Sequence, residues 1–145
     1  MSNTSEKMFF KNKNYFLRSA VTDDHHFIYE LIKDFLKMDL SVTFLKMPSF
    51  DEFFKNNIER FVISDGKISY GFVQILENNE VGYFLDKIHR SKGLGTEAVE
   101  ILMKIKPRDR YFATINDRNE SSKKLVRKLG FIPKATIYEK IIHSD

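Results

Sequence analysis

Two glycines at the start of a helical pattern constrain the fold of this chain more than any other feature. Gly93 and Gly95 follow an apolar segment at residues 80–85, and residues 94–105 then carry apolar side chains at helical spacing. Glycine at a strand-to-helix junction lets backbone N–H groups approach a bound anion closely, because no Cβ intervenes. The segment therefore predicts a helix N-terminus that holds a phosphate-containing ligand.

The same residues also fit a dinucleotide fingerprint, since Gly93-Leu94-Gly95-Thr96-Glu97-Ala98 matches G-x-G-x-x-G/A and Asp117 follows about twenty residues on. In that fingerprint the first glycine directly follows the strand, whereas residues 86–92 intervene here. The residues after Asp117 are also too few to complete a doubly wound sheet. We therefore disfavour an NAD site.

The order of the remaining patterns predicts one α/β (α+β) domain over residues 1–145, with residues 1–13 as a loose N-terminal segment. Besides the helix at 93–105, helices are expected after three capping residues, Thr22, Ser49 and Asn119, and Gly130 should end the last helix. Turn chemistry at Asp65-Gly66 predicts a hairpin. Strands are expected at 15–20, 61–64, 68–76, 80–85 and 111–115, with one or two more within 131–142.

Composition removes several classes of function. The chain has no cysteine, which excludes disulfides, thiolate metal ligands and a cysteine nucleophile, and its four histidines lack ligand spacing, so we expect no metal. No apolar run approaches the roughly 20 residues of a membrane span, so we expect a cytoplasmic protein without a membrane partner. The net charge of +4 favours an anionic partner, which could be a polyphosphate ligand or nucleic acid.

Three segments in order resemble the GNAT superfamily of N-acetyltransferases. Arg90-Ser91-Lys92-Gly93-Leu94-Gly95 looks like the family signature R/Q-x-x-G-x-G/A, Glu80–Leu85 looks like the strand before it, and Asn119–Phe131 looks like the N-x-x-A/S…G-F segment. The likeness is strongest to the branch that includes ribosomal-protein N-terminal acetyltransferases. It implies a central, mostly antiparallel twisted sheet of six or seven strands, about four helices on both faces, and a cofactor in a splayed central strand.

The resemblance also implies acetyl-CoA as co-substrate and an amine acceptor, either a small molecule or a peptide N-terminus. Backbone groups of two strand residues would meet the pantetheine arm, the glycine loop and its basic residues would hold the pyrophosphate, and one asparagine would contact the pantetheine end. These residues are Phe84, Leu85, Arg90, Ser91, Lys92, Gly93, Leu94, Gly95, Thr96 and Asn119. The implied partners exclude nucleic acid and leave a homodimer open.

The expected reaction transfers an acetyl group to a primary amine by direct attack through a tetrahedral intermediate. An ammonium group must first lose a proton, and Glu80 is the candidate base, although a glutamate after Asn78-Asn79 also fits a solvated turn. Relatives place a proton-donating tyrosine where this chain has Val126. Ser122 is the substitute donor, with close packing as its alternative role. A catalytically inactive coenzyme A-binding module is therefore a second hypothesis, and a nucleic-acid-binding domain a third.

Overall fold

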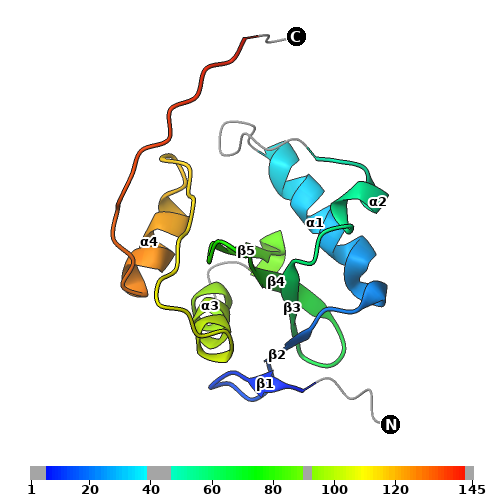
Figure 1. The fold of residues 1–145 in the computed structure, drawn as a ribbon. Coiled ribbons are helices and arrows are strands. Elements are labelled where there is room, and N and C mark those ends of the chain that lie inside the picture. The colour runs from blue at the N-terminus through cyan, green and yellow to red at the C-terminus, as the bar shows by residue number, and fades with distance from the viewer. Residues whose placement is uncertain (1–5, 39–46, 90–92, 143–145) are drawn as a thin grey trace.

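The computed structural model describes residues 6–38, 47–89 and 93–142. Five antiparallel strands form one sheet in the order β1-β2-β3-β4-β5. Helices α1 and α2 lie on one side of this sheet, and α3 and α4 lie on the other (Figure 1). The strands are β1 (Met8–Phe9), β2 (Phe16–Ser19), β3 (Glu59–Ser64), β4 (Ser69–Ile75) and β5 (Val81–Leu85). The helices are α1 (His25–Met38), α2 (Phe50–Phe53), α3 (Leu94–Ile105) and α4 (Glu120–Lys128), with short 3-10 turns at Thr22–Asp24 and Lys87–His89.

The expectation of six or seven strands is wrong for the described residues, which form five. Residues 111–115 contribute only an isolated parallel bridge between Glu80 and Phe112 rather than a strand. Residues 131–142 carry no strand either, and Figure 1 shows the chain after α4 running away from the sheet. Pro133 within that segment has no N–H for a ladder, which weakens strand pairing there.

The N-terminal segment is more ordered than its composition suggests. Met8–Phe9 pairs with β2, and the Phe10 side chain is buried in the core. The amide of Phe10 also donates to the Tyr15 carbonyl. A loose segment over residues 1–13 is therefore the wrong description for residues 8–10, because their apolar side chains cover the outer edge of the sheet.

Local chemistry explains most element boundaries. The Ser49 hydroxyl accepts a hydrogen bond from the Glu52 amide at the start of α2, and Gly130 follows α4 at a φ of 94°. Thr22 does not cap its helix as expected. Instead, the Asp24 carboxylate accepts from the Val21 amide at 2.8 Å, so the acid closes the turn and Thr22 becomes its first residue.

Alternating side chains of the strands build two cores. The larger core lies between the sheet and α3, and the smaller one lies between the sheet and α1. Tight turns hold the strands in register: at the β3–β4 turn, the Asp65 carboxylate accepts from the amides of Lys67 and Ile68 and from the Tyr70 hydroxyl. Strand β5 lies at the edge of this sheet, and the glycine loop that is expected to bind the cofactor follows β5 in the chain.

Candidate active site

Successive residues of β5 face opposite sides of the sheet. Tyr83 and Leu85 pack with the core under α3, whereas Phe84 packs with the core under α1. The Phe84 ring stacks on Phe72 with ring centroids 5.0 Å apart and meets Phe35 edge-on at 5.6 Å. Because the side chains of Phe84 and Leu85 are committed to the core, only their backbone groups can serve a ligand, as the resemblance implies.

Strands β4 and β5 approach each other unusually closely where the pantetheine arm is expected. A Cβ built on Gly71 would lie 2.2 Å from the Phe84 carbonyl oxygen, so no other residue fits at this position without moving β5. Sequence reasoning missed Gly71, although an isolated glycine inside a strand is a known signal of close backbone approach. Gly71 therefore fixes the position of the Phe84–Leu85 backbone.

Residues 111–117 touch the start of β5 and then separate from it. The Val81 amide donates to the Phe112 carbonyl at 2.8 Å, and the Phe112 amide donates to the Asn79 carbonyl at 3.0 Å. Among the described residues, this parallel pairing does not extend beyond the one bridge at Glu80. Two parallel segments that meet at one end and part at the other form the splayed strand expected for the cofactor.

The glycine loop leads into a helix start without a side-chain cap. Gly93 is the N-cap of α3 in the left-handed region, at a φ of 77°, and no side chain bonds to the helix start there. Gly95 is buried, and a Cβ on it would lie 3.2–3.3 Å from Leu125, Leu85 and Tyr83. The glycines therefore bring α3 against β5 and α4 and leave N–H groups of Leu94, Gly95 and Thr96 suited to a pyrophosphate. Arg90, Ser91 and Lys92 lie outside the described residues, and their contacts stay predictions.

Two basic residues that follow α3, Lys106 and Arg108, bind other partners. Lys106 pairs with Glu59, and the Arg108 Nε donates to Asn79 Oδ1. Both lie beyond the C-terminal end of α3, and a helix of 12 residues separates its ends by about 18 Å. These two cations therefore lie too far from the start of α3 to pair with a pyrophosphate there.

Helix α4 begins beside the splayed strand. Asn119 caps it, because its Oδ1 accepts from the Ser122 amide at 3.1 Å and from the Ser121 hydroxyl at 3.2 Å. This capping role occupies the carboxamide oxygen and leaves the Nδ2 group to meet a ligand. The cap was expected from the sequence, whereas contact of Asn119 with the cofactor stays a prediction.

Ser122 has a partner that sequence reasoning missed. Its Oγ lies 2.8 Å from the Tyr83 hydroxyl, within hydrogen-bonding distance. Val126 stands one helical turn after Ser122 and therefore on the same side of α4. Tyr83 therefore places a phenol hydroxyl beside the face of α4 on which Val126 carries none. A signal for this contact existed, because strand alternation aims Tyr83 at the helices and a partly buried tyrosine hydroxyl usually finds a hydrogen-bond partner.

Glu80 lies on the other side of β5 from this hydroxyl pair. The Glu80 amide donates to Asn78 Oδ1 at 3.0 Å, and the Glu80 carbonyl accepts from the Leu76 amide at 2.9 Å. Strand alternation puts the half-buried Glu80 side chain on the face of Gly82 and Phe84, toward α1. The structure therefore brings Ser122 to Tyr83 and separates both from Glu80.

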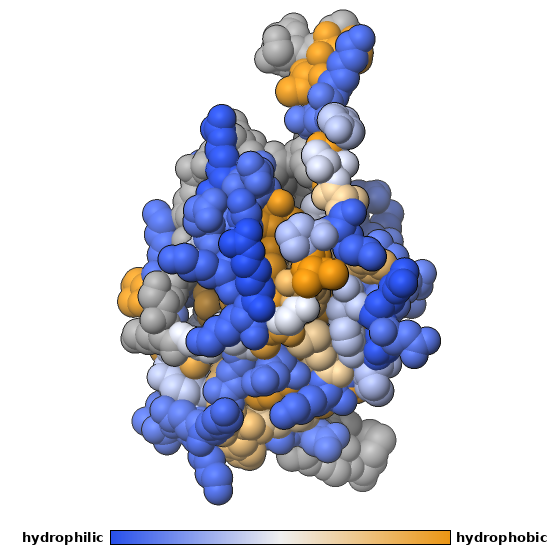
Figure 2. All heavy atoms as spheres, turned by 90° about the vertical axis from the view of Figure 1, so that its left-hand side faces the viewer, coloured by the Kyte–Doolittle hydropathy of each residue, from blue (hydrophilic) through white to orange (hydrophobic). Residues whose placement is uncertain are grey.

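The surface over these elements is amphipathic. Figure 2 looks onto the side that carries α3, α4 and the C-terminal segment, and it shows apolar atoms between two hydrophilic flanks. Within the described residues, no group of three acidic, histidine or cysteine side chains could hold a metal ion. The helices of the same residues include none that could cross a membrane.

Comparison with known proteins agrees with this geometry. The family model described as an acetyltransferase (GNAT) domain matches residues 16–132. No curated protein sequence matches the chain significantly.

Solved acetyltransferases share the fold at low sequence identity. A ribosomal L7/L12 α-N-protein acetyltransferase in complex with coenzyme A is 18% identical, with a TM-score of 0.70 over 90% of this chain and 86% of that one. A Sinorhizobium meliloti phosphinothricin acetyltransferase in complex with acetyl-CoA is 22% identical, with a TM-score of 0.71 over 84% and 77%. The ribosomal-protein-S5-alanine acetyltransferase of Vibrio fischeri is 23% identical, with a TM-score of 0.64 over 90% and 84%.

The expected fold and cofactor are therefore confirmed, apart from the number of strands. The splayed β5, the uncapped start of α3 and the family match over residues 16–132 agree on one assignment. This chain belongs to the GNAT family of acetyltransferases, which use acetyl-CoA as the acetyl donor.

Proposed function

We propose that this protein transfers the acetyl group of acetyl-CoA to a primary amine by direct attack, through a tetrahedral intermediate. The observation that carries the proposal is the Tyr83–Ser122 hydroxyl pair, whose oxygens lie 2.8 Å apart beside the splayed strand. This hydroxyl pair supplies a proton donor on the side of α4 where Val126, an apolar residue, has none to give. The inactive coenzyme A-binding module loses its main motivation, which was the missing phenol.

Binding of the donor depends mainly on backbone groups. The Phe84 and Leu85 backbone would bond the pantetheine arm, and the start of α3 would bond the pyrophosphate, since its helix dipole adds positive potential there. Arg90 and Lys92 would add charge from outside the described residues. The Nδ2 group of Asn119 would contact the pantetheine arm from the α4 side.

Glu80 is the proposed base. An alkylammonium has a pKa of about 10, so near neutral pH it must give up a proton before its nitrogen can attack. The Glu80 side chain is half-buried at the start of β5, next to the point where residues 111–117 part from the strand. It would accept the proton directly or through one water molecule.

Ser122 and Tyr83 are the proposed donors to the departing thiolate. A serine hydroxyl alone is a poor acid, because alcohols ionise at a pKa far above that of a thiol, which is about 8.5. A phenol ionises near 10, which reduces the mismatch with the thiol to about 1.5 units, or about 2 kcal/mol. We therefore infer that Ser122 gives its proton to sulfur as Tyr83 gives its own to Ser122. Tyr83 then regains a proton from solvent, and the acylated nitrogen releases its surplus proton.

The acceptor is an amine on a small molecule or a peptide N-terminus. Structural neighbours act on both kinds, because they include ribosomal-protein acetyltransferases and a phosphinothricin acetyltransferase.

A thiol-release assay across polyamines, amino sugars, amino acids and peptides tests the proposal. Glu80→Gln, Ser122→Ala and Tyr83→Phe should each lower kcat by about 100-fold or more while coenzyme A still binds, since general acid or base catalysis contributes about 10²–10⁴. The Tyr83→Phe/Ser122→Ala double variant should be no slower than either single variant, because both residues serve one proton path. Failure to acetylate any amine, with coenzyme A binding intact, would refute the proposed function.

A further inference from the structure

Arg60 is a buried cation without an anionic partner among the described residues. It lies in β3 on the face toward α1 and is 8% exposed. Its Nε donates to Gln74 Oε1 at 3.0 Å, and its guanidinium lies 4.7 Å from the Phe53 ring centroid and 5.5 Å from that of Phe54. All three partners are neutral, and burial lowers the pKa of Arg60 to about 10. A buried charge in such surroundings is costly unless an anion pairs with it.

Arg18 shows how the same fold treats another arginine near α1. Its guanidinium bonds the Asp24 carboxylate through two nitrogens, at 2.8 and 2.9 Å, and this ion pair raises the pKa of Arg18. The sheet therefore carries one arginine neutralised by a bidentate carboxylate and a second, more deeply buried one that lacks such a group in the described part of the chain. The guanidinium of Arg60 retains donors in the fork geometry that a carboxylate matches.

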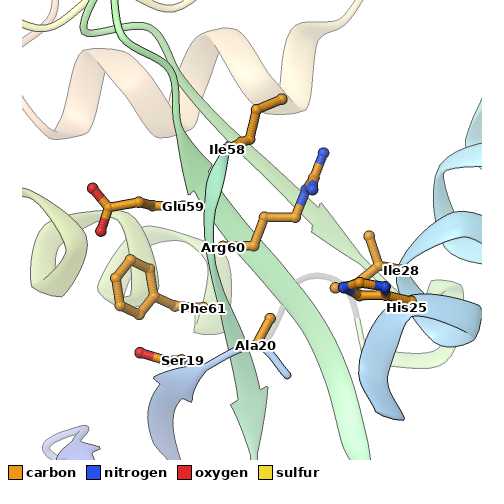
Figure 3. A pocket seen from close by; sticks show the side chains of 8 residues that line it. All are labelled: Ser19, Ala20, His25, Ile28, Ile58, Glu59, Arg60 and Phe61. Atoms are coloured by element: carbon orange, nitrogen blue, oxygen red, sulfur yellow. The ribbon is translucent and has the colours of Figure 1, made fainter. Parts of the chain in front are cut away.

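A hollow adjoins Arg60 where β2 ends, β3 begins and α1 starts. It has a volume of about 230 Å³. Figure 3 shows Arg60 leaving β3 on the side from which His25 and Ile28 approach, while Glu59 and Phe61 leave on the opposite side. The carboxylate in the lining, that of Glu59, pairs with Lys106 and so does not neutralise Arg60. The hollow thus combines the Arg60 cation with apolar side chains, among them Ala20, Ile28 and Ile58, and with the polar Ser19 and His25.

The sheet register relates this hollow to the reacting strand. Arg60 pairs with Gln74 across β3 and β4, and Gln74 pairs with Gly82 across β4 and β5. Gly82 lies on the same face, two residues after Glu80. Because neighbouring strands are about 4.8 Å apart, Arg60 lies about 10 Å across the sheet from β5. Arg60 and Glu80 therefore lie on the same face of the sheet, two strand spacings apart.

We propose that the hollow beside Arg60 binds a carboxylate of the acceptor, so that the preferred substrates are amines joined to a carboxylate by a short apolar chain. This inference rests on the proposed function, since it places the amine at β5. The apolar lining suits the connecting chain, and a singly charged carboxylate loses less hydration energy there than a phosphate dianion does.

Matched acceptors test the inference directly. For the wild-type protein, 6-aminohexanoate should have a kcat/KM about 10- to 100-fold above that of 6-aminohexanamide, as expected for hydrogen bonds to a charged group. Arg60→Gln should reduce this ratio to near 1 by raising the KM of the acid toward the KM of the amide. Arg60→Lys keeps the charge without the fork and should give an intermediate ratio. Lys67→Gln, an exposed lysine in the β3–β4 turn, is the control for net charge and should preserve the ratio.

A binding measurement separates this inference from the proposed function. Glutarate at 20 mM should raise the Tm of the wild-type protein above its Tm in sodium chloride of equal ionic strength, and Arg60→Gln should abolish the difference. If no amine is acetylated but glutarate still stabilises through Arg60, the site stands and the proposed acceptor chemistry fails. A wild-type ratio of kcat/KM for the acid to kcat/KM for the amide near 1 would overturn the carboxylate site. An equal rise in Tm with glutarate in the wild-type and Arg60→Gln proteins would overturn it too. Unchanged coenzyme A affinity verifies that Arg60→Gln is folded. If that variant does not fold, the acid-to-amide ratio of Arg60→Lys and the wild-type measurements test the carboxylate site instead.

Discussion

Replacing Gly71 with alanine should displace β5, the strand expected to bind coenzyme A, more than a methyl group added at any other position of the sheet. The new Cβ would lie 2.2 Å from the Phe84 carbonyl oxygen and 3.0 Å from the Leu85 Cα. A carbon–oxygen contact needs about 3.3 Å, the lower end of the range for weak C–H···O contacts. The strands must therefore separate by about 1 Å, and the obstacle is backbone rather than a flexible side chain.

Two quantities follow from this displacement. Overpacking in a dense core costs about 1–3 kcal/mol, and a fixed backbone atom puts Gly71→Ala at the upper end, about 3 kcal/mol of unfolding free energy. A shift of about 1 Å in groups that position a substrate can reduce catalysis by about 100-fold. We therefore expect lower stability together with weaker coenzyme A binding, because the Phe84 and Leu85 backbone moves.

Gly82→Ala is the matched control, since Gly82 belongs to the same pair of strands. A Cβ there would meet the Gln74 side chain at 3.5 Å, an ordinary contact, so the change in unfolding free energy should stay below about 1 kcal/mol. Urea unfolding gives the free energies and titration calorimetry gives the coenzyme A affinity. If Gly71→Ala unfolds at the wild-type urea concentration and binds coenzyme A normally, the close approach has no energetic meaning and the reasoning is refuted.

Two further predictions concern single side chains. Hydrogen bonds from the Tyr70 hydroxyl and from the Ile68 and Lys67 amides lower the pKa of Asp65 to about 2, so the stability gained from its ionised form is present above pH 4 and is lost as pH falls toward 2. Asp65→Asn should flatten the decline of unfolding free energy between pH 4 and pH 2, and an unchanged slope in urea titrations across that range would contradict the assignment. Asn119→Ala should remove the cap of α4 and cost about 1 kcal/mol, whereas Asn119→Asp, which retains an acceptor oxygen, should restore the stability; equal losses in the two variants by thermal unfolding would argue against the cap.

Sequence alone predicted the elements whose boundaries depend on local chemistry. Asp65-Gly66, Ser49 and Asn119 each act through residues within a few positions of themselves, and the structure shows each at the expected turn or helix start. The β3–β4 hairpin and the helix after Gly93 followed for the same reason. Local signals also identified the family, because its motifs are short and ordered.

Features that depend on distant residues could not be read in this way. Residues 111–115 have a strand-like composition, yet strand formation needs a partner along their length, and here they meet β5 at one bridge only. The close approach at Gly71 and the Tyr83–Ser122 contact each join positions brought together by the fold. The burial of Arg60 depends on Gln74, Phe53 and Phe54, which the fold brings to it from other parts of the chain.

The two faces of β5 carry different groups of the proposed reaction. Glu80 and Gly82 face α1, the side on which Arg60 lies, whereas Tyr83 faces Ser122 on α4. In direct transfer, the amine loses a proton before it attacks, and the sulfur gains one as it departs. These events involve different atoms on opposite sides of the acetyl carbon, so the base and the acid need no contact with each other. The separation of Glu80 from Ser122 is therefore compatible with the proposed reaction, in which the acceptor would approach from the α1 side of the strand and coenzyme A from the α4 side.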